Sequence, residues 1–197
     1  MSLQDPRRDG TIGLLGTAAI VALFVAFLWI VEIVDTLTGN QLDTYGISPR
    51  DPTEVPDILT APFLHASFAH LSANTIPLFV LGVLAAFRSL GRFFAASVII
   101  IFVSGAGVWL TAPEGTVTLG ASGLVFGYFG YVLLRGFADR RPADIVIGLV
   151  VGVLYGSILW GVLPVDPAVS WQGHLFGLIG GVIAAFALRN RQPTRRA

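Results

Sequence analysis

The chain has 197 residues, of which 54% are hydrophobic and 12% are charged, and its 12 basic and 12 acidic side chains leave a formal net charge of zero. Soluble globular domains usually carry about 25% charged residues, so a water-soluble fold of this length could not hide so much apolar surface. The composition favours a lipid bilayer as the solvent, and nothing in it suggests nucleic-acid binding. Cysteine is absent, which excludes thiol catalysis, disulfides and cysteine-ligated metals.

Six apolar runs, bounded by turn residues and charges, follow one another along the chain. They span Thr11 to Val34, His70 to Ser89, Phe93 to Ala112, Ser122 to Ala138, Ala143 to Leu163 and Gln172 to Leu188. The first run is too long for a signal-peptide core and no cleavage site follows it, so we expect a retained helix. In hydrocarbon, backbone N–H and C=O groups must form their hydrogen bonds within each segment, as they do in a helix. The alternation of apolar and polar residues that the strands of a β-barrel show is missing. We therefore expect an all-α membrane protein, a six-transmembrane-helix bundle, that forms a single domain over residues 1–197 with its core at about 11–190.

The arginines predict the orientation of the bundle. Eleven of the twelve arginines lie on one side of the predicted spans, namely Arg7, Arg8, Arg88, Arg92, Arg135, Arg140, Arg141, Arg189, Arg191, Arg195 and Arg196. By the positive-inside rule this side is cytoplasmic and holds both termini. The opposite side carries Arg50, a mainly acidic set of residues and the longest connection, Asp35 to Leu64. That connection contains four prolines and several apolar residues, so we expect it to pack at the membrane interface.

Four polar residues are expected to meet at the outer face. The second, fourth and sixth predicted helices all run inward, so their amino ends lie at the same depth and carry His70 and Asn74, Ser122, and His174, respectively. Neutral imidazole can take the proton of a serine hydroxyl near neutral pH, which makes the serine a nucleophile. The amino end of a helix, with free N–H groups, would stabilise a developing oxyanion.

Glycines accompany this set of residues. Ser122 stands between Gly120-Ala121 and Gly123, and the sixth helix carries Gly173, Gly177 and Gly181 at intervals of four residues. Small residues four apart let two membrane helices approach closely, which a bond between Ser122 and His174 would need. Alone, each motif has a more common explanation: Gly-Ala-Ser-Gly as a helix contact, and a lone histidine as a structural polar group. Their conjunction favours chemistry, because intramembrane ionisable residues are costly.

Three segments together resemble the rhomboid family: His65 through His70 to Asn74, Gly120-Ala-Ser122-Gly123, and His174-x-x-Gly177-x-x-x-Gly181. The resemblance covers about residues 11 to 190. It implies a six-helix bundle with a water-filled cavity open to the outer side, and a Ser-His dyad without a third acid. It also implies no metal and no cofactor.

The resemblance assigns a role to each matching residue. Ser122 is the expected nucleophile, and His174 the general base and then acid. The expected oxyanion hole consists of His70, Asn74 and the backbone N–H of Ser122, while His65 ties the long outer loop to the second helix. The family often has a tyrosine four residues after the serine; here it is Phe126, and we expect its ring still to stack on His174. A Trp-Arg pair that many relatives carry in the outer loop is missing.

The sequence therefore predicts a serine endopeptidase that cleaves membrane-anchored proteins near the outer face. Its partners would be transmembrane substrates and the lipid bilayer, and its location a prokaryotic cell membrane, with the active site open to the extracytoplasmic side. One alternative is a catalytically silent relative that binds transmembrane helices, against which intact Ser122 and His174 argue. Another is a small transporter or channel, which the few buried charges and the absence of an inverted repeat disfavour.

Overall fold

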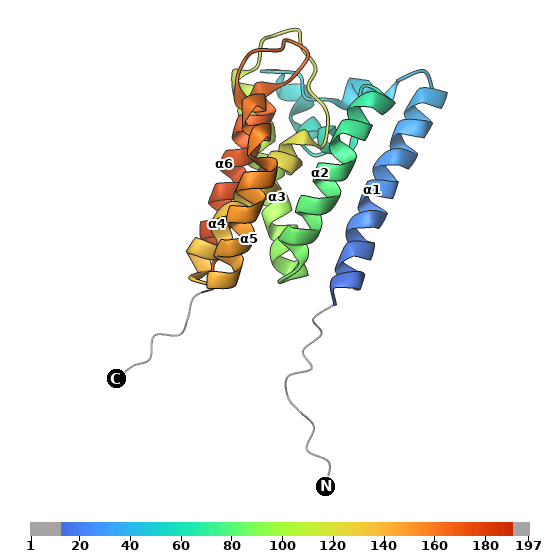
Figure 1. Cartoon of the computed structure of the whole chain (residues 1–197). Helices are drawn as coiled ribbons and strands as arrows, with labels where there is room; N and C mark the ends of the chain where they lie inside the picture. Colours follow the sequence, from blue (N-terminus) through green and yellow to red (C-terminus); the bar gives the residue numbers. More distant parts are fainter. Residues whose placement is uncertain (1–12, 191–197) are drawn as a thin grey trace.

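The computed structural model of the chain describes residues 13–190. Within this part, six α-helices follow one another: α1 Leu14–Leu37, α2 Phe68–Ala86, α3 Leu90–Thr111, α4 Ser122–Asp139, α5 Pro142–Tyr155 and α6 Trp171–Ala187. Short 3-10 segments join them, namely η1 Leu42–Tyr45, η2 Pro52–Ile58, η3 Ala61–Phe63 and η4 Gly156–Val162. The helices form a bundle in which α1 occupies one edge and packs on α2 (Figure 1).

Serine caps set the beginnings of three helices. The hydroxyl of Ser67 accepts a hydrogen bond from the backbone N–H of His70, that of Ser89 from Arg92, and that of Ser170 from Gly173. Each cap satisfies an N–H group that has no partner inside the first helical turn. The caps place His70 and His174 within the first turns of α2 and α6.

The fifth apolar run differs from its prediction. We expected one helix from Ala143 to Leu163, but α5 ends at Tyr155 and the chain continues as the 3-10 segment η4. The change occurs at Gly156, a residue type with lower helix propensity than the Leu154 and Tyr155 before it. None of the residues of η4 is buried. The carboxyl-terminal part of this run is therefore a narrower 3-10 helix.

The central helix of the bundle is α4. It packs against α2, α3, α5 and α6, and most of its side chains are buried. Large apolar side chains on the outer helices instead point away from the bundle, among them Leu15, Leu23, Phe102, Val153 and Leu154. An apolar exterior of this extent suits contact with lipid.

Four stretches of the described chain are long and apolar enough to cross a membrane: α1, α2, α3, and α5 together with η4. The apolar helix α6 is shorter, with 17 residues, and α4 does not belong to this group. In membrane proteins, small and polar residues lie at contacts between helices and not on the lipid-facing surface, which accounts for the more polar sequence of the enclosed helix α4. The chain is a multi-pass integral membrane protein.

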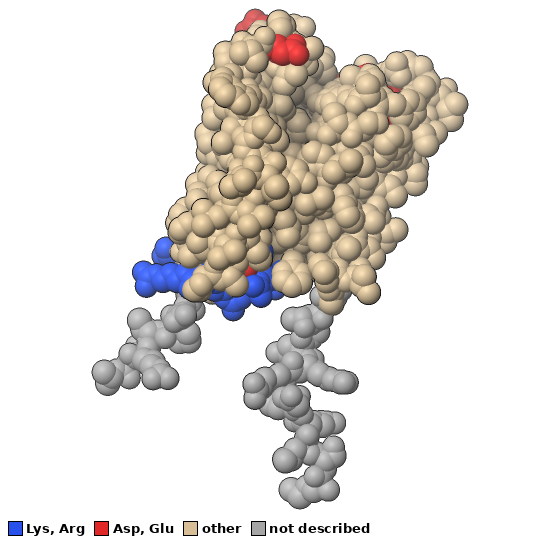
Figure 2. All heavy atoms as spheres, viewed as in Figure 1, with Lys and Arg blue, Asp and Glu red and all other residues tan. Residues whose placement is uncertain are grey.

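Arginines gather at one end of the bundle, whereas acidic side chains show mainly at the other (Figure 2). Asp144, on α5, forms ion pairs with Arg88 at 3.0 Å and with Arg135 at 3.7 Å, and Arg92 pairs with Asp139 at 2.8 Å. Arg135 also donates a hydrogen bond to the carbonyl oxygen of Leu84, near the end of α2. These bonds tie α2, α3, α4 and α5 together at this end. Arg7, Arg8, Arg191, Arg195, Arg196 and the predicted start of the first helix at Thr11 lie outside the described residues.

The long connection after α1 packs against the carboxyl end of α3. Ile47 forms an antiparallel bridge with Thr118. The side chain of Arg50 bonds to Glu114 at 2.8 Å, and the indole N–H of Trp109 donates to the carbonyl oxygen of Asp51 at 3.0 Å. These contacts hold the connection, which lacks the Trp-Arg pair named above.

Candidate active site

Ser122 is the first residue of α4, directly after a tight turn. Gly120 has a φ of +125°, which a residue with a side chain rarely adopts. A Cβ atom at this position would lie 2.7 Å from the Cε1 atom of His70. The turn that leads to Ser122 thus lies directly against the His70 ring. At position 120 only glycine can both adopt the backbone angles and fit the available space.

His65 contacts the same turn from the other side. Its Nε2 atom accepts a hydrogen bond from the backbone N–H of Ala121 at 3.3 Å, and its ring meets the His70 ring edge to face at 5.1 Å. Burial, together with the neighbouring His70, lowers the pKa of His65 to about 4. The ring is therefore neutral at physiological pH, as an acceptor must be. The sequence predicted a contact with the second helix; the bond to the turn before Ser122 was not foreseen.

Asn74 lies one turn below His70 on α2 and is buried. Its side-chain amide donates a hydrogen bond to the carbonyl oxygen of His70 at 3.2 Å. An asparagine amide has two N–H donors, so one is left for another acceptor. His70, Asn74 and the start of α4 thus lie near one another.

His174 is buried on α6 and is held by two contacts. Its ring stacks on Phe126 with 4.1 Å between centroids and 10° between planes, as expected from the sequence. Its Nδ1 atom lies 2.8 Å from the carbonyl oxygen of Gly161 in η4. No residue pattern in the sequence pointed to Gly161, because the bond involves only its backbone.

Helices α4 and α6 touch through their backbones, as the glycine spacing predicted. A Cβ atom at Gly177 would overlap the carbonyl oxygen of Gly123, and one at Gly181 would overlap that of Gly127. Ser104 of α3 joins the contact, because its hydroxyl donates a hydrogen bond to the carbonyl oxygen of Gly173 at 2.9 Å.

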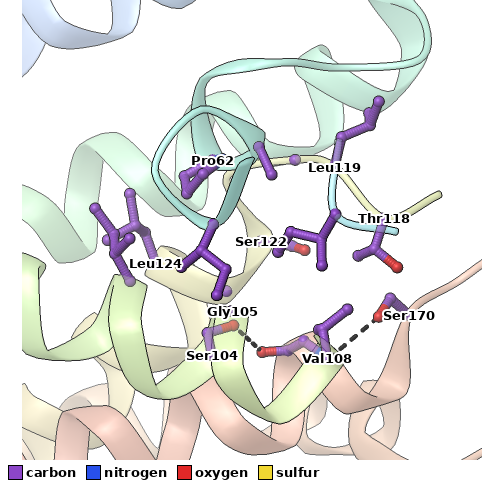
Figure 3. Close-up of a pocket in the computed structure, with 16 residues that line it drawn as sticks. Pro62, Ser104, Gly105, Val108, Thr118, Leu119, Ser122, Leu124 and Ser170 are labelled. Atoms are coloured by element: carbon purple, nitrogen blue, oxygen red, sulfur yellow. Dashed lines mark hydrogen bonds between the residues drawn. The ribbon is translucent and has the colours of Figure 1, made fainter. Parts of the chain in front are cut away.

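A small cavity of about 30 Å³ adjoins Ser122. Figure 3 shows its walls, which come from the outer loop, α3, the turn before α4, and the start of α6. Most of the walls are apolar, and polar atoms come from Ser104, Thr118, Ser122 and Ser170. A cavity of this volume has room for about two water molecules. It lies on the side of Ser122 that faces α3, and His174 does not line it.

Within residues 13–190, no hydrogen bond joins the hydroxyl of Ser122 to the His174 ring. Catalytic hydrogen bonds are often long before substrate binds and shorten in the complex. The roles of Ser122, His174, His70 and Asn74 stay predictions. Their positions at the same ends of α4, α6 and α2 agree with the arrangement expected from the sequence.

Residues 52–191 match the family described as Rhomboid domain. An uncharacterized protein of Mycobacterium tuberculosis is 45% identical over 185 residues, which cover 90% of this chain and 76% of the relative. YdcA of Bacillus subtilis, provisionally named a rhomboid protease, is 28% identical over 82% of this chain and 78% of its own length. Rhomboid protease GluP of the same organism is 28% identical over 87% of this chain, a match that spans 34% of GluP.

Proposed function

Because the chain belongs to the rhomboid family, we propose that it is an intramembrane serine endopeptidase that cleaves membrane-anchored proteins near the outer membrane face. Ser122 is the nucleophile and His174 the general base and acid. All six helices cross the bilayer as one domain, with both termini in the cytoplasm and the active site open to the extracytoplasmic side. The arginines at one end of the bundle, with acidic side chains mainly at the other end, support this orientation.

The observation that carries the proposal is the way in which the His174 ring is held. Stacking on Phe126 fixes the plane of the ring, and the Gly161 carbonyl occupies Nδ1. A neutral imidazole held in this way can offer Nε2 as the base. The contact between Gly123 and Gly177 keeps the helix that begins at Ser122 against the helix that carries His174.

The proposed reaction has two stages. His174 Nε2 takes the proton of the Ser122 hydroxyl while the oxygen attacks the peptide carbonyl, and the developing oxyanion is stabilised by the Ser122 N–H, His70 and Asn74. The imidazolium then gives its proton to the leaving amine, and an acyl-enzyme remains on Ser122. Water attacks the acyl group with His174 again as base, which releases the acid product and restores the serine.

The alternative is a silent member of the family that binds transmembrane helices without cutting them. Labelling with a serine-directed fluorophosphonate separates the two, since only an activated serine reacts. We expect the purified protein in lipid to be labelled and to cut members of a panel of single-span proteins, with the cuts mapped by mass spectrometry. Binding of the panel without labelling or cleavage would favour the silent alternative.

A further inference from the structure

The bond between His174 and Gly161 determines where the imidazole proton resides. A backbone carbonyl oxygen can only accept, so the Nδ1 atom, at 2.8 Å from it, must donate. A neutral imidazole has one N–H group. With the proton on Nδ1, the lone pair is on Nε2, which is the tautomer that a general base acting through Nε2 needs.

Gly161 is fitted closely against the two stacked rings. A Cβ atom on it would lie 2.9 Å from Cζ of Phe126 and 3.0 Å from Nδ1 of His174. Even one methyl group would therefore push the backbone of η4 away from α6 or shift the rings. At the other end of the same segment, a Cβ on Gly156 would meet nothing within 4 Å.

Apart from this bond, the segment that carries Gly161 contacts the bundle through partly buried side chains, such as that of Ile158. No residue of η4 is buried, and α5, which precedes it, buries only Asp144, Gly148 and Val151. The first of these lies at the arginine end of the bundle, far along the helix from η4. Few buried contacts make a segment easy to displace.

We propose that the backbone carbonyl of Gly161 is a positioning group for His174, which holds the base in its Nδ1–H tautomer in the place where a serine triad has a carboxylate. Because this carbonyl belongs to η4, the preference for this tautomer depends on the docking of η4 on α6. This inference rests on the proposed protease function for its catalytic meaning, but the tautomer itself does not depend on it.

The tautomer can be read directly by nitrogen-15 NMR of the full chain with labelled histidine, reconstituted in lipid. The sequence holds three histidines, and single replacement of His65 and of His70 assigns the remaining signals. We expect neutral His174 to carry its proton on Nδ1. A proton on Nε2 would overturn the inference, whatever the activity of the protein.

The catalytic consequence is tested with Gly161→Ala and the matched control Gly156→Ala, which places the same methyl group at the open end of η4. We expect fluorophosphonate labelling of Ser122 to slow by roughly 3- to 10-fold in Gly161→Ala, the effect of losing one ordinary hydrogen bond. The His174 signals should also change to a mixture of tautomers, while Gly156→Ala matches the parent in both measurements.

Two other results would overturn the positioning role of Gly161. The first is that Gly161→Ala has the labelling rate and the His174 tautomer of the parent. The second is that labelling slows equally in Gly161→Ala and Gly156→Ala, which would indicate a general requirement for η4. If the parent shows the Nδ1–H tautomer but no labelling, the proposed protease function fails and the tautomer assignment stands. The two claims can therefore fail separately.

Discussion

Gly177 of α6 lies against the carbonyl group of Gly123 of α4, so closely that a Cβ atom on Gly177 would overlap the carbonyl oxygen. The contact is between two backbones, which cannot move aside as a flexible side chain can. Gly123 is the neighbour of Ser122, and Gly177 is three residues from His174, one turn along α6. The distance between the proposed nucleophile and base therefore depends on this contact.

Replacing Gly177 with valine should separate the two helices. Overpacking a core usually costs about 1–3 kcal/mol, and we expect a loss of about 3 kcal/mol here because backbone atoms obstruct the new side chain. Thermal unfolding in detergent measures the loss, and fluorophosphonate labelling should fall with it. The matched control is Gly91→Val, since a Cβ at this helical position meets only the Ser89 hydroxyl at 3.8 Å. Equal stability of the two variants would show that the contact is unimportant.

The buried His65 should make stability depend on pH. Its pKa is lowered from 6.5 to about 4, so between these values the unfolded chain binds a proton that the folded chain does not. The free energy of unfolding should therefore fall as the pH is lowered from about 6.5 to 4, by up to about 3 kcal/mol in total. Unfolding measured at several pH values should show that the free energy of unfolding changes with pH in the parent, and changes less in His65→Asn. Identical slopes would exclude His65 as the source.

The proposed roles of Ser122 and Asn74 predict different effects of their replacement on the reaction, without loss of the fold. Ser122→Ala should abolish cleavage and labelling, while the helices stay folded, because only one hydroxyl at a cavity wall is removed. Asn74→Ala should be milder, with turnover reduced by roughly 10²- to 10³-fold, as is usual for loss of one oxyanion donor. Turnover of a single-span substrate measures both. Parental cleavage by purified Ser122→Ala, free of other proteases, would disprove the proposed mechanism.

The ion pairs at the two ends of the bundle should differ in their contribution to stability. Asp144 is buried between Arg88 and Arg135, so Asp144→Asn leaves buried charge unpaired and should cost about 3–5 kcal/mol. Glu114→Gln breaks the exposed pair with Arg50 and should cost about 1 kcal/mol or less. Thermal unfolding of both variants makes the comparison. A larger loss of stability in Glu114→Gln than in Asp144→Asn would contradict this prediction.

Much of the helix order was predictable because hydrocarbon imposes a length and an apolar composition on each span. The spacing of His65, His70 and Asn74 and the glycines of α4 and α6 were likewise visible, since their chemistry depends on the residue type. The break of the fifth helix at Gly156 was harder to foresee, because Gly148 and Gly152 of the same run lie inside α5 without ending it.

The missed contacts share one property: each involves a backbone group. The carbonyl of Gly161 holds His174, and the N–H of Ala121 bonds to His65. Every residue has a carbonyl group and nearly every one an N–H, so residue type does not indicate which of them is used. Only the arrangement of the chain in space brings these two groups to the histidines.

The bonds of Arg135 and Asp144 hold α2, α4 and α5 together at one end of the bundle, whereas at the other end η4 contains no buried residue and its Gly161 carbonyl lies against His174. A rod that is fixed at one end pivots there, and its free tip travels furthest. Any displacement of α5 about its anchored end would therefore be largest at Gly161. The arginine end of the bundle would thus be the fulcrum of a lever whose tip carries the contact to His174.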